Sequence, residues 1–216
     1  MPAPTPSHTE TLASKTDDWF RRANAALLSQ LPCRAGCAHC CIGVFPITRL
    51  DVRLLQEGLA RLPENERARI ATRSAQQIAA IESAYPALRS SPSLDGWSDA
   101  QIDRVVDAFH DARCPALRDD EQCSIYPYRP LACRSMGIPT REHDIMNGAC
   151  AVQTFVPIVR LPESLASEED ALARQESAEL ARLPEVAAQG EELLNPYGFL
   201  SSDAERKHGT AFDSDH

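Results

Sequence analysis

Half of the chain's eight cysteines fall within nine residues, in the order Cys33-x3-Cys37-x2-Cys40-Cys41. Thiolates this close repel one another and oxidise easily unless something binds them, so the run predicts a loop that folds around a ligand. The other cysteines form one later block, after a long stretch that has none: Cys114, Cys123, Cys133 and Cys150. Two separate cysteine-rich segments indicate two halves of a metal site that folding brings together.

The size and charge of the chain narrow the interpretation of these cysteines. With 216 residues, the chain can bury a real core and does not need cross-links to hold a small fold together. Its formal net charge is −9 and no basic stripe stands out, which gives nucleic-acid binding little electrostatic support. We therefore expect no nucleic-acid partner.

The location of the chain also bears on its thiols. Residues 1–8 lack the basic and apolar regions of a secretory signal, and no apolar run approaches the roughly 18 residues of a membrane span. We therefore expect a cytoplasmic protein without a membrane partner. Reducing conditions there keep thiols from pairing, so the cysteines indicate metal binding or redox chemistry rather than a disulfide framework.

Helical periodicity and breaker residues predict a mainly α-helical chain. Two helix starts carry capping boxes, Thr48 with Asp51 and Ser98 with Gln101. Both cysteine blocks read as irregular, because glycines and prolines interrupt them. Residues 86–97 are predicted to be a loop, and Ala151–Leu161 is the best strand candidate. The predicted helices are 10–30, 48 to about 62, 63–85, 98 to about 113, and 164–183.

These patterns predict a single helical domain with an irregular cysteine-rich metal-binding centre and, at most, one short strand pair. Its parts are a disordered N-terminus at 1–9, a cysteine-cluster metal-binding domain at 10–161, a C-terminal helical segment at 162–201 and a flexible tail at 202–216. The segments at 1–9 and 202–216 are polar and rich in residues that favour disorder.

Spacing within the first block leaves two questions open. Gaps of two or three residues let a loop turn successive sulfurs towards one centre, as in zinc knuckles and cluster loops. Neighbouring side chains diverge, so either Cys40 or Cys41 could face a second centre or lie outside the ligand shell. Sulfurs of the second block could complete the same site, or the eight cysteines could form two sites. An isolated cysteine such as Cys150 could also be a small buried apolar residue.

The first cysteine block is also similar to one known cluster-binding loop, but the sequence around it does not fit that class of enzyme. Cys33-x3-Cys37-x2-Cys40 is similar to the cluster loop of radical S-adenosylmethionine enzymes, which are built on β/α barrels. Here a helix precedes the loop, no β/α alternation follows, and His39 stands where that loop usually has an aromatic residue. This comparison therefore gives the chain no radical chemistry.

The second block carries a more specific resemblance. It reads Cys-Pro-Ala-Leu from Cys114, and Cys-Ser-Ile-Tyr-Pro-Tyr-Arg-Pro-Leu-Ala-Cys-Arg from Cys123 to Arg134. Together with the first block, this order and spacing resembles the YkgJ-type cysteine-cluster family (CxxCxxCC), over about residues 33–150. The resemblance implies a zinc- or iron-chelating domain. The candidate metal ligands are Cys33, Cys37, Cys40, Cys41, Cys114, Cys123, Cys133 and Cys150.

Arg129 and Arg134 lie on either side of Cys133 in the sequence. Guanidinium groups could offset the negative charge of a thiolate site and contact the bound cofactor, or they could brace the proline-rich loop through its carbonyl oxygens. His39 lies inside the first block, but the abundance of cysteine makes it a secondary ligand candidate.

The surplus of thiols favours an iron–sulfur cluster, 4Fe–4S rather than another type, over a single structural zinc. The predicted function is a cytoplasmic metalloprotein with an electron-transfer or redox-support role, whose partners are the metal or cluster and a protein redox partner. The alternatives are a zinc-stabilised interaction module and a metal-handling protein without catalysis. Whether the chain is an enzyme is left open.

Overall fold

The computed structural model describes residues 11–27, 37–138, 140–142, 145–147 and 161–200. The described part is mainly α-helical, which confirms the predicted fold class. Cys33, Cys150, the segments predicted to be disordered and nearly all of the strand candidate at 151–161 lie outside the described residues. None of the described helices is long and apolar enough to cross a membrane.

The centre of the fold is formed by α2 (Arg49–Ala60) and α3 (Glu64–Ala84), with the short helix α9 (Asn195–Gly198) packed against both. Both predicted capping boxes are present, at the start of α2 and at the start of α5 (Asp99–Ala108). α5 ends earlier than predicted: Phe109 caps it, residues 109–111 form a turn, and Arg113 pairs with Ile42 just before Cys114.

Prolines start helices in this fold where they were expected to break structure. The predicted loop at 86–97 contains α4 (Ala87–Ser90), which follows Pro86 directly. The second cysteine block contains the 3-10 turn η2 (Tyr126–Tyr128) and α6 (Leu131–Ser135), which follows Pro130. The expectation of wholly irregular structure in these segments was wrong, because proline fits the first turn of a helix, where its missing N–H is not needed.

Two short antiparallel strand pairs complete the described part. β1 (Pro46–Thr48) pairs with β4 (Glu192–Leu194), so that Pro46 faces Leu194 and Thr48 faces Glu192. β2 (Thr140–Glu142) pairs with β3 (Ile145–Asn147). The sequence predicted one short pair and did not reveal the second, because a three-residue strand is too short to show an alternating pattern.

A main apolar core surrounds α2 and α3. It draws residues from Val44 to Leu200, and Leu55, Ile70 and Ile81 are completely buried in it. The last described residues belong to this core, since Leu193, Leu194, Tyr197, Phe199 and Leu200 are all part of it. The domain bounds drawn from the sequence stay a prediction.

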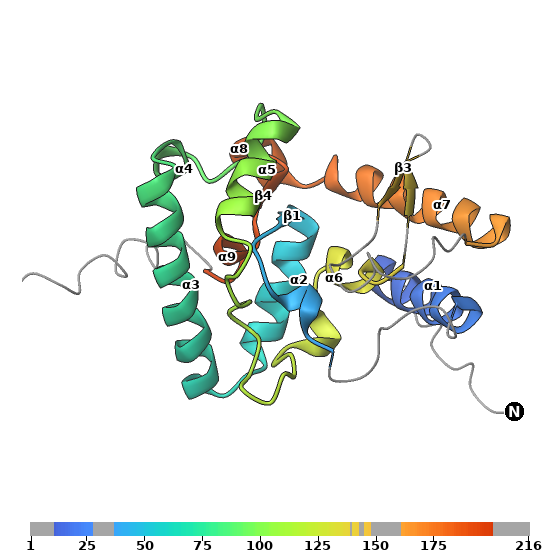
Figure 1. Ribbon diagram of the computed structural model, residues 1–216, viewed down its shortest axis with the longest axis horizontal. Helices are drawn as coiled ribbons and strands as arrows, with labels where there is room; N and C mark the ends of the chain where they lie inside the picture. Colours follow the sequence, from blue (N-terminus) through green and yellow to red (C-terminus); the bar gives the residue numbers. More distant parts are fainter. Residues whose placement is uncertain (1–10, 28–36, 139, 143–144, 148–160, 201–216) are drawn as a thin grey trace, which may run out of the picture.

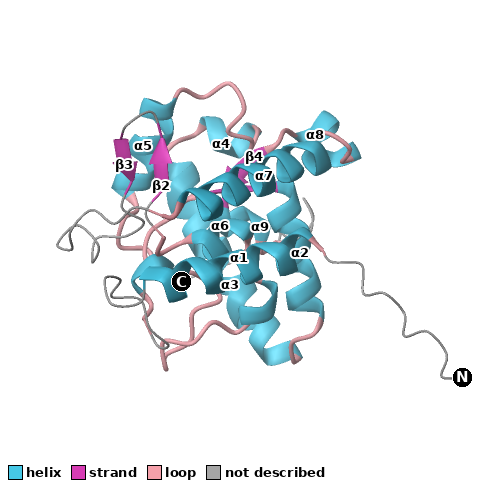
Figure 2. Ribbon diagram, turned by 90° about the vertical axis from the view of Figure 1, so that its right-hand side faces the viewer, coloured by secondary structure: helices cyan, strands magenta, loops and turns pink. Residues whose placement is uncertain are grey.

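A second layer lies on the side of α2 away from α3 (Figure 1). It consists of α1 (Leu12–Leu27) and α7 (Glu163–Leu180), with α6 packed against α1. Its own small apolar cluster contains Trp19, Ala23, Leu27 and Ile138. The Trp19 indole Nε1 donates to the Leu165 carbonyl oxygen at 2.9 Å, which ties α1 to α7. Figure 2 shows the same helices from the side, with α8 (Pro184–Gln189) leading on from α7.

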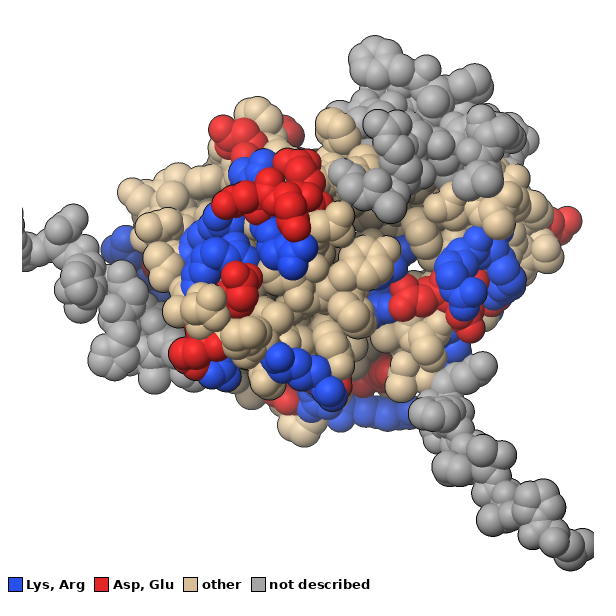
Figure 3. All heavy atoms as spheres, turned by 90° about the horizontal axis from the view of Figure 1, so that it is seen from below, with Lys and Arg blue, Asp and Glu red and all other residues tan. Residues whose placement is uncertain are grey.

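Charged groups are distributed over the surface in ion pairs. On the face shown in Figure 3, Lys and Arg lie among Asp and Glu and do not form one basic stripe. Exposed pairs such as Arg53–Glu185 and Arg61–Glu57 have nitrogen–oxygen distances of 2.8 and 2.9 Å.

Candidate metal centre

Backbone hydrogen bonds join the two cysteine blocks directly. The Cys114 N–H donates to the Cys41 carbonyl oxygen at 2.8 Å, and the Gly43 N–H donates to the Ala112 carbonyl oxygen at 2.7 Å. Ile42 and Arg113 pair between these bonds as an isolated antiparallel bridge. Gly43 adopts φ +99°, a left-handed conformation that glycine tolerates best. The first block therefore runs alongside the start of the second.

Cys123 lies at the end of a tight loop that begins near Leu117. Leu117 and Cys123 form a bridge, and the Arg118 N–H donates to the Gln122 carbonyl oxygen at 2.9 Å. Two arginines of α3 donate hydrogen bonds to backbone carbonyl oxygens of this loop. Arg73 donates to Leu117 at 2.8 Å, and Arg69 donates to Pro115 at 3.2 Å. Protein contacts alone therefore brace the loop.

Cys133 is carried by α6, whose start is fixed by a buried carboxylate of α2. The Leu131 N–H donates to Asp51 Oδ1 at 2.5 Å, while Asp51 also closes the capping box with Thr48. Asp51 is 1% exposed, and burial raises its pKa to about 6, against the opposing effect of these two backbone donors. This single side chain thus links the start of α2 to the helix that presents Cys133.

All six described cysteines have free thiols and intermediate exposure: Cys37, Cys40, Cys41, Cys114, Cys123 and Cys133. Burial raises the pKa of Cys114 to about 12, raises the pKa of Cys133 well above its usual value, and also raises the pKa of Cys123. With no metal bound, burial keeps these sulfurs protonated at neutral pH. A bound metal would remove that cost by taking the place of the protons.

Cys40 and Cys41 behave as a pair. Interaction between the two side chains lowers the pKa of Cys40 and raises the pKa of Cys41. The ionisation of either thiol therefore opposes that of the other. Although neighbours in sequence were expected to diverge, these two side chains lie close enough to interact.

The thiols of the two blocks lie close enough for their charges to interact. Ionisation of Cys40 opposes that of Cys114, Cys123 and Cys133, and Cys114 and Cys133 in turn oppose ionisation of Cys41. Folding therefore places five of the predicted ligands within reach of one another's charge. Cys37 is also described and has a free thiol of intermediate exposure, and Cys33 and Cys150 lie outside the described residues.

The described thiols do not form a complete set of ligands around one point. Within the described ranges, no group of three or more His, Cys, Asp or Glu side chains is placed so that it could hold a metal ion. The donor chemistry nevertheless fits a thiophilic metal, since the converging atoms are thiols with raised pKa values. Which of the eight cysteines bind metal stays a prediction.

The two predicted arginines have different positions. Arg134 has a side chain only 2% exposed and donates to the carbonyl oxygens of Pro127 and Arg129, at 2.7 and 3.0 Å. It also pairs with Asp17 of α1, so it braces the loop and fastens α1 to it. Arg129 donates to Asp17 at 2.8 Å and lies close enough to Cys40 and Cys123 to lower the pKa of both thiols. Arg129 is therefore the better placed to offset thiolate charge.

Asp17, Asp51, Arg69 and Arg73 were missed as supports of this centre. The capping box identified Asp51 as a helix start, but its contact with Leu131 spans 80 positions and leaves no local signal. Asp17, Arg69 and Arg73 lie on polar helix faces, for which the sequence predicts only exposure to solvent. His39 is exposed, and so are the large apolar side chains of Ile42 (36%) and Tyr126 (59%) beside the cysteines.

A helical scaffold that gathers free thiols from two loops defines a cysteine-rich metal-chelating class of domain. The comparison with family models agrees: the CxxCxxCC model, described as a "Putative zinc- or iron-chelating domain", matches residues 32–151. The chain belongs to this family, as the spacing of its cysteines predicted. Neither the curated proteins nor the solved structures include a significant match. The family description supports metal binding by this chain in general.

Proposed function

We propose that the chain is a cytoplasmic iron–sulfur protein that holds a 4Fe–4S cluster through cysteines of both blocks. The observation that supports this best is that five thiols of the two blocks lie close enough to influence one another's ionisation: Cys40, Cys41, Cys114, Cys123 and Cys133. A 4Fe–4S cluster takes four thiolates, as a structural zinc does, and the eight cysteines of the two blocks supply more than one such set.

Arg129 gives this proposal a source of compensating charge. Its guanidinium lies near Cys40 and Cys123 and is held by Asp17 and by the ring of Tyr126, whose centroid is 4.1 Å away. A cationic group held beside thiolates stabilises the negative charge that they carry when they bind a metal or a cluster. A bound cluster would supply one-electron chemistry, which makes electron transfer or redox support the proposed role.

A metal-handling role is the second candidate, and a specific observation favours it over a purely structural zinc. The loops around Cys114, Cys123 and Cys133 are braced by hydrogen bonds that Arg69 and Arg73 donate and that Asp51 accepts. A site whose walls are held without metal could release its metal and keep its shape. A zinc that alone maintained the fold would instead be expected where protein contacts are few.

Anaerobic purification tests the proposal most directly. We expect a brown protein containing iron and sulfide, with visible absorption that dithionite bleaches. Colourless protein with stoichiometric zinc would overturn the cluster. Cys133→Ser should abolish metal retention if the blocks share one site, and Ser135→Ala on the same helix is the matched control. Full retention by Cys133→Ser would overturn the shared site.

A chelator distinguishes the two candidates once the metal is known. We expect the far-ultraviolet circular dichroism to persist after the metal is stripped, because the loops have their own braces. Rapid stripping of iron or zinc with the fold intact would support metal handling, and loss of the helical signal together with the metal would indicate a structural site.

A further inference from the structure

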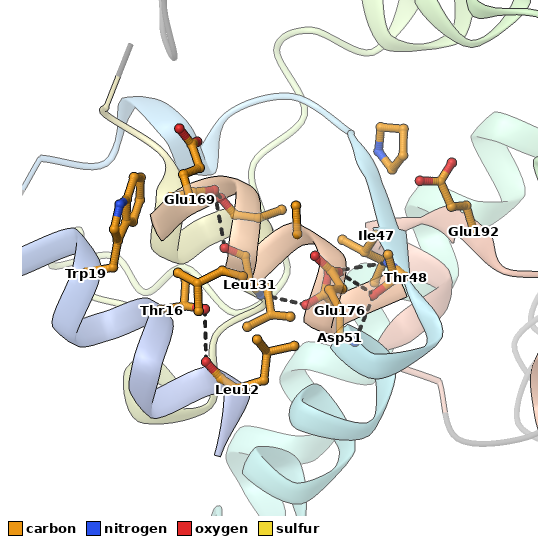
Figure 4. Close-up of a pocket in the computed structure, with 15 residues that line it drawn as sticks. Leu12, Thr16, Trp19, Ile47, Thr48, Asp51, Leu131, Glu169, Glu176 and Glu192 are labelled. Carbon is orange, nitrogen blue, oxygen red and sulfur yellow. Dashed lines mark hydrogen bonds between the residues drawn. The ribbon is translucent and has the colours of Figure 1, made fainter. Parts of the chain in front are cut away.

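A cavity of about 250 Å³ lies where α1, α2, α6 and α7 meet (Figure 4), and none of the described residues that line it is a cysteine. Its apolar lining includes Leu12, Trp19, Leu131 and Leu172. None of the described residues that line it is Lys, Arg or His, but four carboxyl side chains do so: Asp51, Glu169, Glu176 and Glu192. The cavity therefore gathers like charges from three different elements without a cation to balance them.

Glu176 of α7 is the carboxyl that closes this cavity against the start of α2. Its Oε1 accepts a hydrogen bond from the Thr48 hydroxyl at 3.3 Å (Figure 4). Burial raises the pKa of Glu176 to about 7, and the neighbouring charge of Asp51 raises it further than the Thr48 bond lowers it. The docked position of α7 is therefore more stable when this carboxyl is neutral than when it is ionised.

The elements packed around Glu176 provide it with no direct cationic partner among the described groups. Asp51 faces it from α2, and Glu192, with Glu191 just before β4, faces it from the strand side. On α2, Arg49 follows Thr48 directly and donates to the carbonyl oxygens of Gly190 and Gln189, at 3.0 and 2.7 Å. On α1, Lys15 donates to Gln175 at 3.0 Å and Arg22 pairs with Glu168; on α6, Arg134 acts on Asp51 and is held by Asp17.

α7 in turn holds α1 in place. Trp19 donates to the Leu165 carbonyl oxygen, Lys15 to Gln175, and Arg22 to Glu168. α1 precedes the first cysteine block along the chain, and Asp17 connects it to Arg129 beside the thiols. A change in the docking of α7 would therefore loosen the layer that also supports the metal centre.

We propose that α7 is a pH-sensitive clasp, which Glu176 closes against Thr48 when its carboxyl is protonated and loosens when the carboxyl is ionised. The clasp does not depend on a metal at the cysteines, so it can be tested on the chain as purified, whatever that chain contains. When α7 is released, the Trp19 side chain becomes exposed to solvent and the α1–α7 layer separates from the main core.

The direction of the pH effect follows from the proton count. Glu176 holds its proton up to about pH 7 when docked, whereas a released, solvated glutamate loses it near its ordinary value of 4.5. Between these limits the docked form binds more protons, so docking weakens as the pH rises and then levels off above about 7. The ratio of released to docked α7 should rise roughly 10- to 100-fold between pH 5 and pH 8.

Hydrogen exchange measured by mass spectrometry tests this ratio even when the released form is rare. After correction for the intrinsic pH dependence of exchange, amides of α7 should lose protection by that factor between pH 5 and pH 8. Amides of α3 should change much less, because α3 lies in the main core. Equal changes in both helices would indicate global unfolding and overturn the clasp.

Glu176→Gln supplies the decisive variant, since a neutral amide can occupy the same place at every pH. Its α7 should keep its protection at pH 8. Asp170→Asn is the matched control, as it removes one negative charge from an exposed position of the same helix. The clasp is wrong if Glu176→Gln keeps the wild-type pH dependence or if Asp170→Asn abolishes it.

Tryptophan quenching gives a second measurement that does not need the Glu176 variant. The chain has two tryptophans, so Trp97→Phe leaves Trp19 as the reporter of the layer, and Trp19→Phe leaves Trp97 as the reporter of the main core. Acrylamide quenching of Trp19 should increase from pH 5 to pH 8 while that of Trp97 stays constant. Constant quenching of both, together with unchanged exchange in α7, would overturn the clasp.

Discussion

The main core and the α1–α7 layer are held together by different forces. The core joins buried apolar side chains from Val44 to Leu200, and its stability depends on excluded water and close packing. The layer has only a small apolar cluster around Trp19, and polar contacts join α1 to α7, as in Arg22–Glu168, and α7 to the start of α2, as in Thr48–Glu176. We conclude that pH and salt should act on the layer before they act on the core.

The largest effect on stability is expected from a substitution in the main core. Leu55 is completely buried, and Leu55→Ala should lower the free energy of unfolding by about 3 kcal/mol, since it leaves a cavity among side chains that cannot close it. Leu172→Ala, at a partly buried position packed on the Trp19 cluster, should cost less than about 1 kcal/mol. Urea unfolding followed by circular dichroism measures both. Equal losses would mean that layer and core unfold as one unit.

A smaller effect is expected where the core touches the cysteine loops. A Cβ at Gly58 of α2 would lie 2.7 Å from the Tyr128 Cβ, so Gly58→Ala must displace η2. We expect a loss of about 2 kcal/mol in the free energy of unfolding, because overpacking of this size forces a backbone shift.

The same substitution should also reduce the metal retained per chain, because η2 lies between Cys123 and Cys133. Metal analysis of the purified variant measures this, and Ala60→Ser, at an exposed position of the same helix, is the control. Full metal content in Gly58→Ala would show that the position of η2 does not govern the site.

The smallest effect is expected in the layer. The side chains of Arg22 and Glu168 are 52% and 37% exposed, so their pairing is screened by water and salt. Arg22→Ala should change the free energy of unfolding by no more than about 0.5 kcal/mol. A double-mutant cycle with Glu168→Ala, repeated at high salt, measures the pair; a coupling that survives high salt would mean the pair is effectively buried.

The sequence predicted the fold class, the two capping boxes and the family, because each depends on residues close together along the chain. Thr48 and Asp51 are three positions apart, and so are Ser98 and Gln101. The β1–β4 pair was missed because its strands are three residues long and lie far apart in the sequence.

The same distinction between local and long-range contacts applies to the candidate metal centre. Spacing identified the cysteines and predicted that two blocks would meet; a backbone hydrogen bond from Cys114 to Cys41 joins the blocks, and the set of metal ligands stays a prediction. It could not reveal that Asp51 holds Leu131 or that Asp17 holds both arginines, since these contacts join residues 80 or more positions apart. A carboxylate on a helix face carries no mark of the backbone N–H or guanidinium that folding brings to it.

The pairing of β1 with β4 has a consequence for the chain during its synthesis. Thr48 leaves the ribosome long before Glu192, its partner in the pair, and at 5–20 residues per second the delay is about 7–30 s. Cys40 and Cys41 are made even earlier. Nascent chains therefore carry reactive thiols for seconds before their core can close, and throughout that interval they are open to oxidants, chaperones and metal donors alike.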